Sequence, residues 1–311
     1  MQLRNVRLLI VAVFGLPLLP AQITPPEITS IGYYAPTVIR VTPGQFVTLF
    51  VRGLSVSKAT ANSVPLPTSL GAISVTAKSN TPGFPTSLPI LRVDPYDAGC
   101  IDFFGERCDA AAVTVQIPME GTCTPSISDL NCATEPALLT VQANGVASRA
   151  FRVSVDYRFQ RVHVLTSDDS LVGKNNCFLG GCEHQPYITH ADGSLVTSDN
   201  PAHAGETIVV YAVGLGTTTP AVKTGDATPS PAPTAQRPMA LLSYVIGGNS
   251  GGLLYPVYAG LVTGYVGLYQ VNLQLPARLP DQIAPCQPSQ VGNTELLFEG
   301  SSDSVLFCFQ P

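Results

Sequence analysis

Residues 201–220 read PAHAGETIVVYAVGLGTTTP and decide the fold: a turn, an apolar run and a glycine-punctuated loop follow one another. The run at 207–213 is rich in β-branched residues, which favour strands. Gly214 and Gly216 stand where such a strand would end and where glycine best suits the backbone angles. The stretch therefore predicts a core strand over 207–213 that ends at GLG.

Three motifs occur in the same order in both halves of the chain. The first pair aligns without a gap, so that Gly44 matches Gly205 and Gly53 matches Gly214. Matched motifs at similar spacing indicate an internal duplication. The pairs are PGQFVTLFVRGL (43–54) with AGETIVVYAVGL (204–215), AAVTVQIP (111–118) with YQVNLQLP (269–276), and LLTVQANGVASRAFRVSV (138–155) with ELLFEGSSDSVLFCFQ (295–310).

Both halves hold short apolar runs separated by Gly, Pro, Asn and Ser, without a long segment of helical periodicity. Asn144–Gly145, between two such runs, predicts a hairpin turn in which both residues take a positive φ. Units of this size and pattern are typical of immunoglobulin-like β-sandwiches. We therefore predict an all-β fold of two tandem immunoglobulin-like β-sandwich domains, at 22–157 and 158–311, the second with an irregular, disulfide-bearing entry segment at 160–200.

The first 21 residues have the pattern of a secretory signal peptide. Arg4 and Arg7 precede an apolar run at 8–19, and Ala21 supplies a small residue for cleavage. The run is short and interrupted by glycine and prolines, which disfavours a membrane anchor. We expect a signal peptide at 1–21 and a secreted protein at the cell exterior, with the periplasm as an alternative location.

Eight cysteines follow this segment, and an even number in an exported chain indicates disulfide bonds. A metal site is the alternative, but the chain contains no C-x-x-C motif. The simplest connectivity joins sequence neighbours, although spacing alone fixes no pairing. The predicted pairs are Cys100 with Cys108, Cys123 with Cys132, Cys177 with Cys182, and Cys286 with Cys308.

Charged residues make up only 12% of the chain, and its 27 glycines and 28 prolines indicate a turn-rich β protein. The net charge is −5, and loss of Arg4 and Arg7 with the signal peptide would make it −7. Nucleic-acid binding needs a basic patch, and none is visible in the sequence. The composition therefore argues against a nucleic-acid partner.

Residues 190–311 contain DGSLVTSDNPAHAGETIVVYAVGLG, VIGG, VYAG and GYVGLYQVNLQLP at spaced positions, followed by a final strand pair. In these motifs the chain resembles the uncharacterised C-terminal domain family of secreted Solibacter-type (acidobacterial) proteins. The upstream copy is similar to the degenerate half that often precedes that domain. The resemblance implies an exported bacterial module of immunoglobulin-like fold. It implies no catalytic residue, because the function of the family is not established.

The motif GNSGG at 248–252 satisfies the G-x-S-x-G pattern of a serine-hydrolase nucleophile. That pattern requires a strand, a sharp turn and a helix. Here Ser250 lies between two strand-like runs, and no helix-forming segment follows. A glycine-rich hairpin is the better interpretation, so we assign no catalytic residue.

Three histidines at 184, 190 and 203 lie close together in the sequence, and a zinc or copper site is one interpretation. Their spacing matches no established ligand pattern, so loop histidines are the preferred interpretation. His163, which alternates with valines, is expected in a strand. We therefore assign no metal ligand and no cofactor-binding residue.

Calcium is a weaker alternative, because acidic residues cluster at Asp94 with Asp97 and at Asp168 with Asp169. Neither cluster supplies the ligand series of a calcium loop. Solvated turns are the preferred interpretation of both, and the segment at Asp192 fits a β-turn.

Sugar binding would use exposed aromatic side chains, and the chain has no tryptophan. Most of its aromatic rings are expected in the core. The candidates are Tyr33, Tyr34, Phe103, Phe104, Tyr255, Tyr258, Tyr265 and Tyr269.

We expect a secreted, non-catalytic β-sandwich protein that binds or scaffolds at the cell exterior, with polysaccharide or cell-envelope components as partners. The alternative is a carbohydrate-active or other secreted hydrolase with its site on the loops at 94–108 or 160–200. A third possibility is an assembly module that uses an exposed edge strand to pair with another chain.

Overall fold

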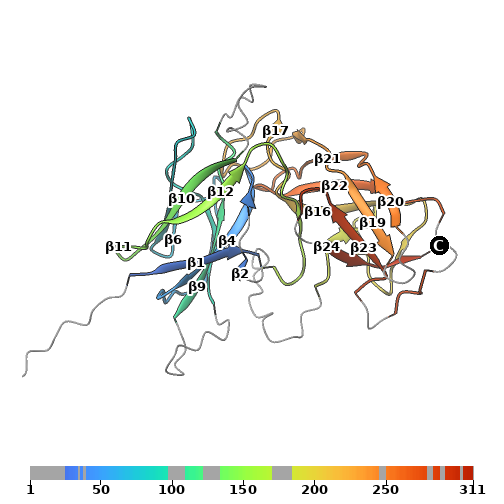
Figure 1. The fold of residues 1–311 in the computed structure, drawn as a ribbon, viewed down its shortest axis with the longest axis horizontal. Coiled ribbons are helices and arrows are strands. Elements are labelled where there is room, and N and C mark those ends of the chain that lie inside the picture. Colours follow the sequence, from blue (N-terminus) through green and yellow to red (C-terminus); the bar gives the residue numbers. More distant parts are fainter. Residues whose placement is uncertain are drawn as a thin grey trace, which may run out of the picture.

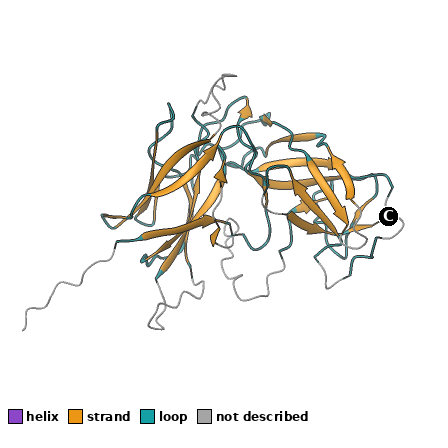
Figure 2. Cartoon of the chain, in the orientation of Figure 1, coloured by secondary structure: helices purple, strands orange, loops and turns teal. Residues whose placement is uncertain are grey.

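The structure is a computed structural model, and every regular element in its described part is a β-strand (Figure 2). The predicted all-β fold is confirmed. Within this part, no helix is long and apolar enough to cross a membrane. The predicted signal peptide lies outside it. The described residues are 25–33, 36–37, 40–96, 109–121, 134–169, 184–244, 250–278, 283–287, 291–301 and 304–310.

Two sheets make up the N-terminal half, residues 25–156. One has the order β2-β1-β4-β9-β8-β5, formed by β1 (Glu27–Gly32), β2 (Pro36–Thr37), β4 (Phe46–Arg52), β5 (Ala59–Thr60), β8 (Ile90–Pro95) and β9 (Ala110–Gln116). The other has the order β3-β12-β10-β7-β6, with β11 beside β10, formed by β3 (Arg40–Val41), β6 (Ser69–Leu70), β7 (Ile73–Ser79), β10 (Thr134–Ala143), β11 (Val146–Ala147) and β12 (Phe151–Asp156).

These two sheets pack face to face around one apolar cluster. Val47 and Val113 reach it from the first sheet, and Val75 and Val141 reach it from the second. Strand β7 shows the expected alternation, because its residues 73, 75 and 77 are buried. Burial of these alternating side chains is the main force that holds the sandwich together.

Two large sheets and one short pair make up the C-terminal half, residues 163–310 (Figure 1). The first has the order β13-β16-β22-β21-β18-β17, with β14 beside β16, formed by β13 (His163–Val164), β14 (Ile188–Thr189), β16 (Thr207–Val213), β17 (Thr218–Thr219), β18 (Thr234–Ala235), β21 (Tyr258–Leu261) and β22 (Tyr269–Gln274). The second has the order β20-β19-β23-β24, formed by β19 (Ala240–Tyr244), β20 (Ser250–Leu254), β23 (Thr294–Phe298) and β24 (Ser304–Phe307). The short strands β15 (Ala202–His203) and β25 (Phe309–Gln310) pair in parallel.

The core strand predicted at 207–213 is confirmed as β16, and residues 208, 210, 212 and 213 of it are buried. The Asn144–Gly145 turn is also confirmed, with φ of +49° and +79°. It joins β10 to β11, which pair directly across the turn. Both predictions held because each depends on a local pattern of side chains.

Equivalent strands of the two halves pair in the same register. Phe46 of β4 lies opposite Gln116 of β9, and Thr207 of β16 lies opposite Gln274 of β22. These are the positions that the aligned motifs match. A parallel contact also recurs, between β3 and β12 in one half and between β15 and β25 in the other. The duplicated unit stays a prediction, which these registers support.

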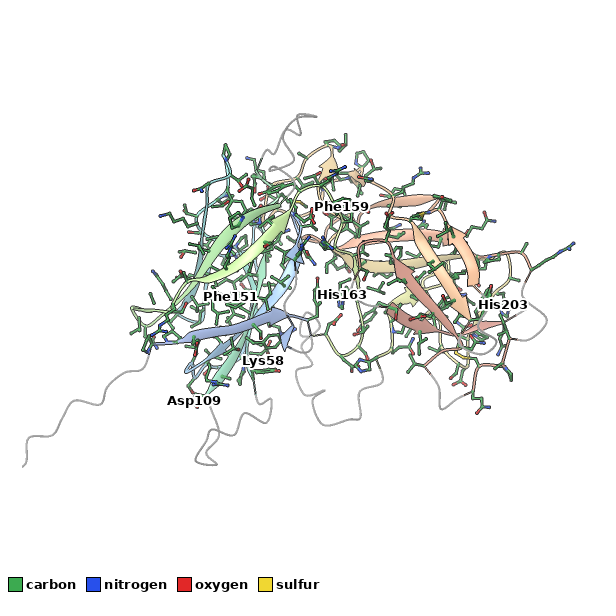
Figure 3. All side chains as sticks on the ribbon, in the orientation of Figure 1. Lys58, Asp109, Phe151, Phe159, His163 and His203 are labelled. Carbon is green, nitrogen blue, oxygen red and sulfur yellow. A yellow bond between two sulfur atoms is a disulfide. The ribbon has the colours of Figure 1, made fainter. Side chains whose placement is uncertain are left out.

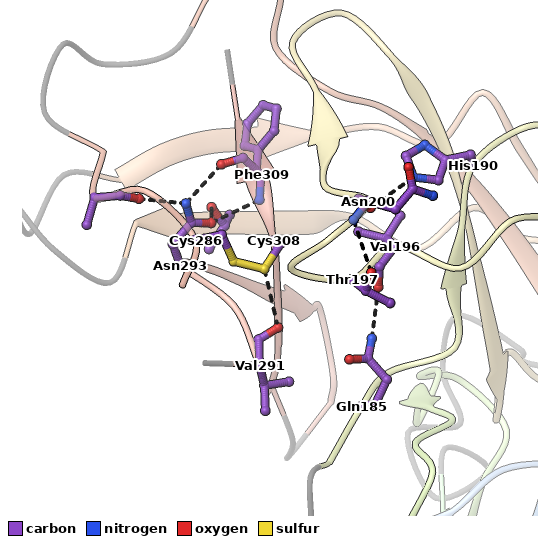
Figure 4. Close-up of a disulfide and its surroundings, with 12 residues drawn as sticks. Gln185, His190, Val196, Thr197, Asn200, Cys286, Val291, Asn293, Cys308 and Phe309 are labelled. Carbon is purple, nitrogen blue, oxygen red and sulfur yellow. Dashed lines mark hydrogen bonds between the residues drawn. A yellow bond between two sulfur atoms is a disulfide. The ribbon is translucent and has the colours of Figure 1, made fainter. Parts of the chain in front are cut away.

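The predicted Cys286–Cys308 disulfide is confirmed, and it links residues 22 positions apart (Figure 4). Asn293 fixes the same segment, because its side-chain amide donates to the carbonyl oxygens of Ala284 and Phe309. Its side-chain oxygen accepts from the Phe309 amide at 2.9 Å. The other six cysteines, Cys100, Cys108, Cys123, Cys132, Cys177 and Cys182, lie outside the described residues.

Candidate functional site

The structure shows where the GNSGG motif lies, which the sequence offered as a candidate hydrolase nucleophile. Ser250 opens strand β20, which pairs with β19 as the second strand of a hairpin. The two flanking runs therefore pair as a hairpin, but residues 250–252 lie in its second strand rather than in a loop, and residues 248–249 lie outside the described residues. Strand β20 leads on to β21 rather than to a helix. Ser250 thus lacks the local geometry of a hydrolase nucleophile.

The histidines at 184, 190 and 203 do not converge on one point. His184 contacts Asp168, with 2.9 Å between Nδ1 and Oδ2. His190 contacts Glu206 through Nδ1, whereas the side chain of His203 is exposed. His203 also lies far from His163 in Figure 3. In the described part of the chain, no three His, Cys, Asp or Glu side chains are placed to hold a metal ion.

His163 lies in strand β13, as predicted, and it is only 3% exposed. Its ring stacks on Tyr33 of the other half, with 3.5 Å between ring centroids. Its Nε2 lies 3.0 Å from both carboxylate oxygens of Asp169, which also accepts a hydrogen bond from the Thr166 amide. This cluster joins the two halves through the stacked rings.

Asp168 and Asp169 are buried, so their interpretation as solvated turn residues is wrong. The reason is that each carboxylate contacts a histidine, Asp169 with His163 and Asp168 with His184. These contacts compensate the loss of hydration. Asp94 is buried too, where it contacts Arg92 at 2.8 Å and Lys58 at 3.5 Å. Asp97 lies outside the described residues. The turn at Asp192 is confirmed, since its carboxylate accepts from the Ser194 amide and hydroxyl.

The tyrosines divide between core and surface. Tyr269 is fully buried and Tyr33 nearly so, as expected for core rings. Tyr255 and Tyr265 are 71% and 59% exposed. Tyr34, Phe103 and Phe104 lie outside the described residues.

His190 makes the stability of the C-terminal half depend on pH. Burial lowers the pKa of this imidazole, but hydrogen bonds to Glu206 and the Asn200 carbonyl and the charges of Glu206 and Asp192 raise the pKa above its ordinary value. A raised folded-state pKa stabilises the protein below the unfolded-state pKa of about 6.5, and this contribution is lost as the pH rises through the folded-state value.

We therefore expect the free energy of unfolding to fall by about 0.5 kcal/mol over that pH range, the size typical of a partly exposed ion pair. The His190→Gln variant should lose this decrease, and chemical denaturation at a series of pH values measures it. His203→Gln is the control because it changes a neighbouring exposed histidine. An unaltered pH dependence in His190→Gln would rule out this assignment.

The candidate functional site is a surface that the sequence reasoning missed. Leu253 of β20 lies opposite Leu241 of β19, which in turn lies opposite Leu297 of β23. These leucines point away from the core, since their neighbours at 242 and 296 are fully buried. Leu306 of β24 is a fourth leucine on the same side, and it lies opposite Glu295 of β23 rather than opposite Leu297. We call Leu241, Leu253, Leu297 and Leu306 the outer leucine face.

The outer leucine face is unusual for a sheet that faces solvent. Leu253 is 54% exposed and Leu306 is 38% exposed. The solvent face of an antiparallel sheet normally carries polar residues. In the N-terminal half, the corresponding row runs from Lys78 through Leu138 to Arg152 and is mostly charged. These two corresponding rows therefore differ, because one consists of leucines and the other is mostly charged.

Exposed apolar side chains continue beyond this face. Tyr255 and Val257 follow Leu253 at two-residue spacing, and Val257 is 49% exposed. Strand β20 is also the edge of its sheet, and within the described residues its outer side pairs with no strand. An apolar edge strand next to an apolar face is typical of a surface that contacts another molecule.

A sequence signal for this face exists in the doubled leucines. The pairs at 241–242, 253–254 and 296–297 each place one leucine on either side of a strand.

Comparison of the sequence with protein-family models finds no match, and comparison with curated proteins finds none. The resemblance to the acidobacterial family stays a prediction, and the function is inferred from this surface.

Proposed function

We propose that this protein is secreted and non-catalytic, and that it binds or scaffolds at the cell exterior through the outer leucine face. In this proposal, the chain forms two duplicated, immunoglobulin-like domains, and the second carries the contact surface. The observation that carries the proposal is the row of Leu253, Leu241 and Leu297 across three neighbouring strands. A row of this kind is stabilised when a partner removes it from water.

The chemistry of the face favours a protein component of the envelope over a polysaccharide. Sugar rings bind best to aromatic side chains, whereas four leucines offer an aliphatic surface. The buried acidic side chains support a structural rather than catalytic role, because Asp156, Asp168 and Asp169 are paired with Arg161, His184 and His163. The disulfide is compatible with an oxidising location such as the cell exterior.

Retention of the purified, oxidised protein on insoluble polysaccharides and on the producing organism's envelope fraction tests this proposal. We expect saturable retention on the envelope fraction, independent of calcium, that is lost after protease treatment of that fraction. Retention on a polysaccharide alone would favour a sugar-binding module. Absence of retention on any of these materials would contradict the proposal.

A further inference from the structure

A second feature, separate from the outer leucine face, is a pocket of about 540 Å³ where the two halves meet. Strands β4 and β8 and the loop at 61–66 contribute its wall on one side. Strand β16, the segment after β13 and the turn at 264–268 contribute the other. The apolar side chains of the wall include Phe46, Leu66, Leu91, Leu165, Val213 and Val266.

The wall of this pocket is held in place by hydrogen bonds between the halves. The Leu66 amide donates to the Gly225 carbonyl at 2.9 Å, and the Gly225 amide donates to the Gln116 side chain at 2.7 Å. The Met119 amide donates to the Thr224 hydroxyl at 2.7 Å. A binding site that is formed before the ligand arrives loses less conformational entropy on binding.

The lining of the pocket defines the chemistry of its ligand. Among the residues that the structure describes, no charged side chain lines it, and its polar side chains, Asn62, Ser63 and Tyr265, lie at exposed positions. A charged ligand would lose hydration without gaining a partner, which is costly. A neutral ligand would bury apolar surface inside and keep a polar group near Asn62 and Ser63. The volume lies within the range of small-molecule sites, roughly 300–1,000 Å³.

We propose that this pocket binds one small, neutral, mainly apolar organic molecule that carries a single hydrogen-bonding group. The site is independent of the outer leucine face, which belongs to the other sheet of the C-terminal half. In this proposal, the protein has two separate binding sites. The small molecule binds in the pocket between the halves, and the envelope partner binds to the outer leucine face.

Fluorescence titration with the neutral dye N-phenyl-1-naphthylamine tests this proposal on the full chain. We expect saturable binding of one dye per protein. The anionic relative 1-anilinonaphthalene-8-sulfonate should bind at least about ten-fold more weakly, because its sulfonate finds no cation among the described lining residues. Equal binding of both dyes, or absence of saturable binding of the neutral dye, would overturn the proposal.

Two variants locate the dye. Ala61→Phe places a ring in the pocket, on a residue whose backbone amide is already bonded to the Leu91 carbonyl. Tyr265→Glu places a charge at an exposed position of the lining without disturbing the core. Each should weaken binding of the neutral dye at least about ten-fold, a loss of about 1.4 kcal/mol.

Matched controls use the same substitutions elsewhere. Ala147→Phe changes an exposed alanine of β11, and Tyr255→Glu changes an exposed tyrosine beside the outer leucine face. Both should bind the dye as the parent protein does. If Tyr255→Glu or Leu253→Lys abolished binding and the pocket variants preserved it, the dye would occupy the leucine face, and the pocket proposal would be wrong.

Discussion

Replacing Gly214 by alanine is expected to lower the free energy of unfolding by about 3–5 kcal/mol, the combined size of a forced left-handed backbone and an overpacked contact. Gly214 ends the core strand β16 with a φ of +84°. A Cβ atom there would lie 2.1 Å from the Arg161 carbonyl oxygen and 3.0 Å from the Gln45 side-chain nitrogen. Both neighbours belong to the junction between the halves, and the Arg161 contact is with backbone that cannot rotate away.

Gly145→Ala is the matched control for this variant. Gly145 has a similar φ of +79°, and a Cβ atom there would meet no atom within 4 Å. Gly145→Ala should lower the free energy of unfolding only by the cost of the left-handed backbone conformation, about 1 kcal/mol. Chemical denaturation measures both. If Gly214→Ala cost no more than Gly145→Ala, the close packing of β16 against the linking segment would not stabilise the protein.

Removal of the Cys286–Cys308 bond is expected to lower the free energy of unfolding by about 3 kcal/mol, the size typical of a closed loop of this length. The bond joins residues 22 positions apart and closes a loop that contains strands β23 and β24. Loss of the link gives the unfolded chain more conformations, so the folded state becomes relatively less stable. The double variant Cys286→Ala, Cys308→Ala tests this by denaturation.

The single variant Cys286→Ala separates the lost link from lost packing, because it leaves the fully buried Cys308 side chain in place. We expect the single and double variants to be destabilised to a similar extent. A loss below about 1 kcal/mol in both would mean that the link adds little beyond the surrounding packing. The Asn293 hydrogen bonds would then be the main restraint on this segment.

Strands and hairpins were predictable here because their signals are local. The apolar run of β16 and the Asn144–Gly145 turn each depend on a few adjacent side chains. The Cys286–Cys308 pair followed from the simplest connectivity and is confirmed. Compartment, family and the duplicated origin of the halves stay predictions.

The contacts of buried polar residues were not predictable, since they depend on how distant segments meet. Tyr33 and His163 are 130 positions apart and stack only because the halves dock against each other. Asp169 is buried because His163 and the Thr166 amide lie beside it. A sequence pattern that fits a solvated turn carries no information about such partners.

The outer leucine face could be predicted only in part from the sequence. Doubled leucines indicate strands that are apolar on both sides. Their meaning depends on strand order, because Leu241, Leu253 and Leu297 form one row only when β20, β19 and β23 are neighbours. That order was not derivable from the spacing of the runs.

The most direct test of the proposed function is retention of Leu253→Lys on the envelope fraction, compared with Leu138→Lys. Both leucines are exposed, by 54% and 41%, but Leu138 lies between Lys78 and Arg152 in the other half. We predict that Leu253→Lys lowers affinity at least about ten-fold, as expected when a charge replaces the most exposed leucine of the contact face, and that Leu138→Lys leaves affinity unchanged. Equal retention of both variants would contradict the role of the outer leucine face.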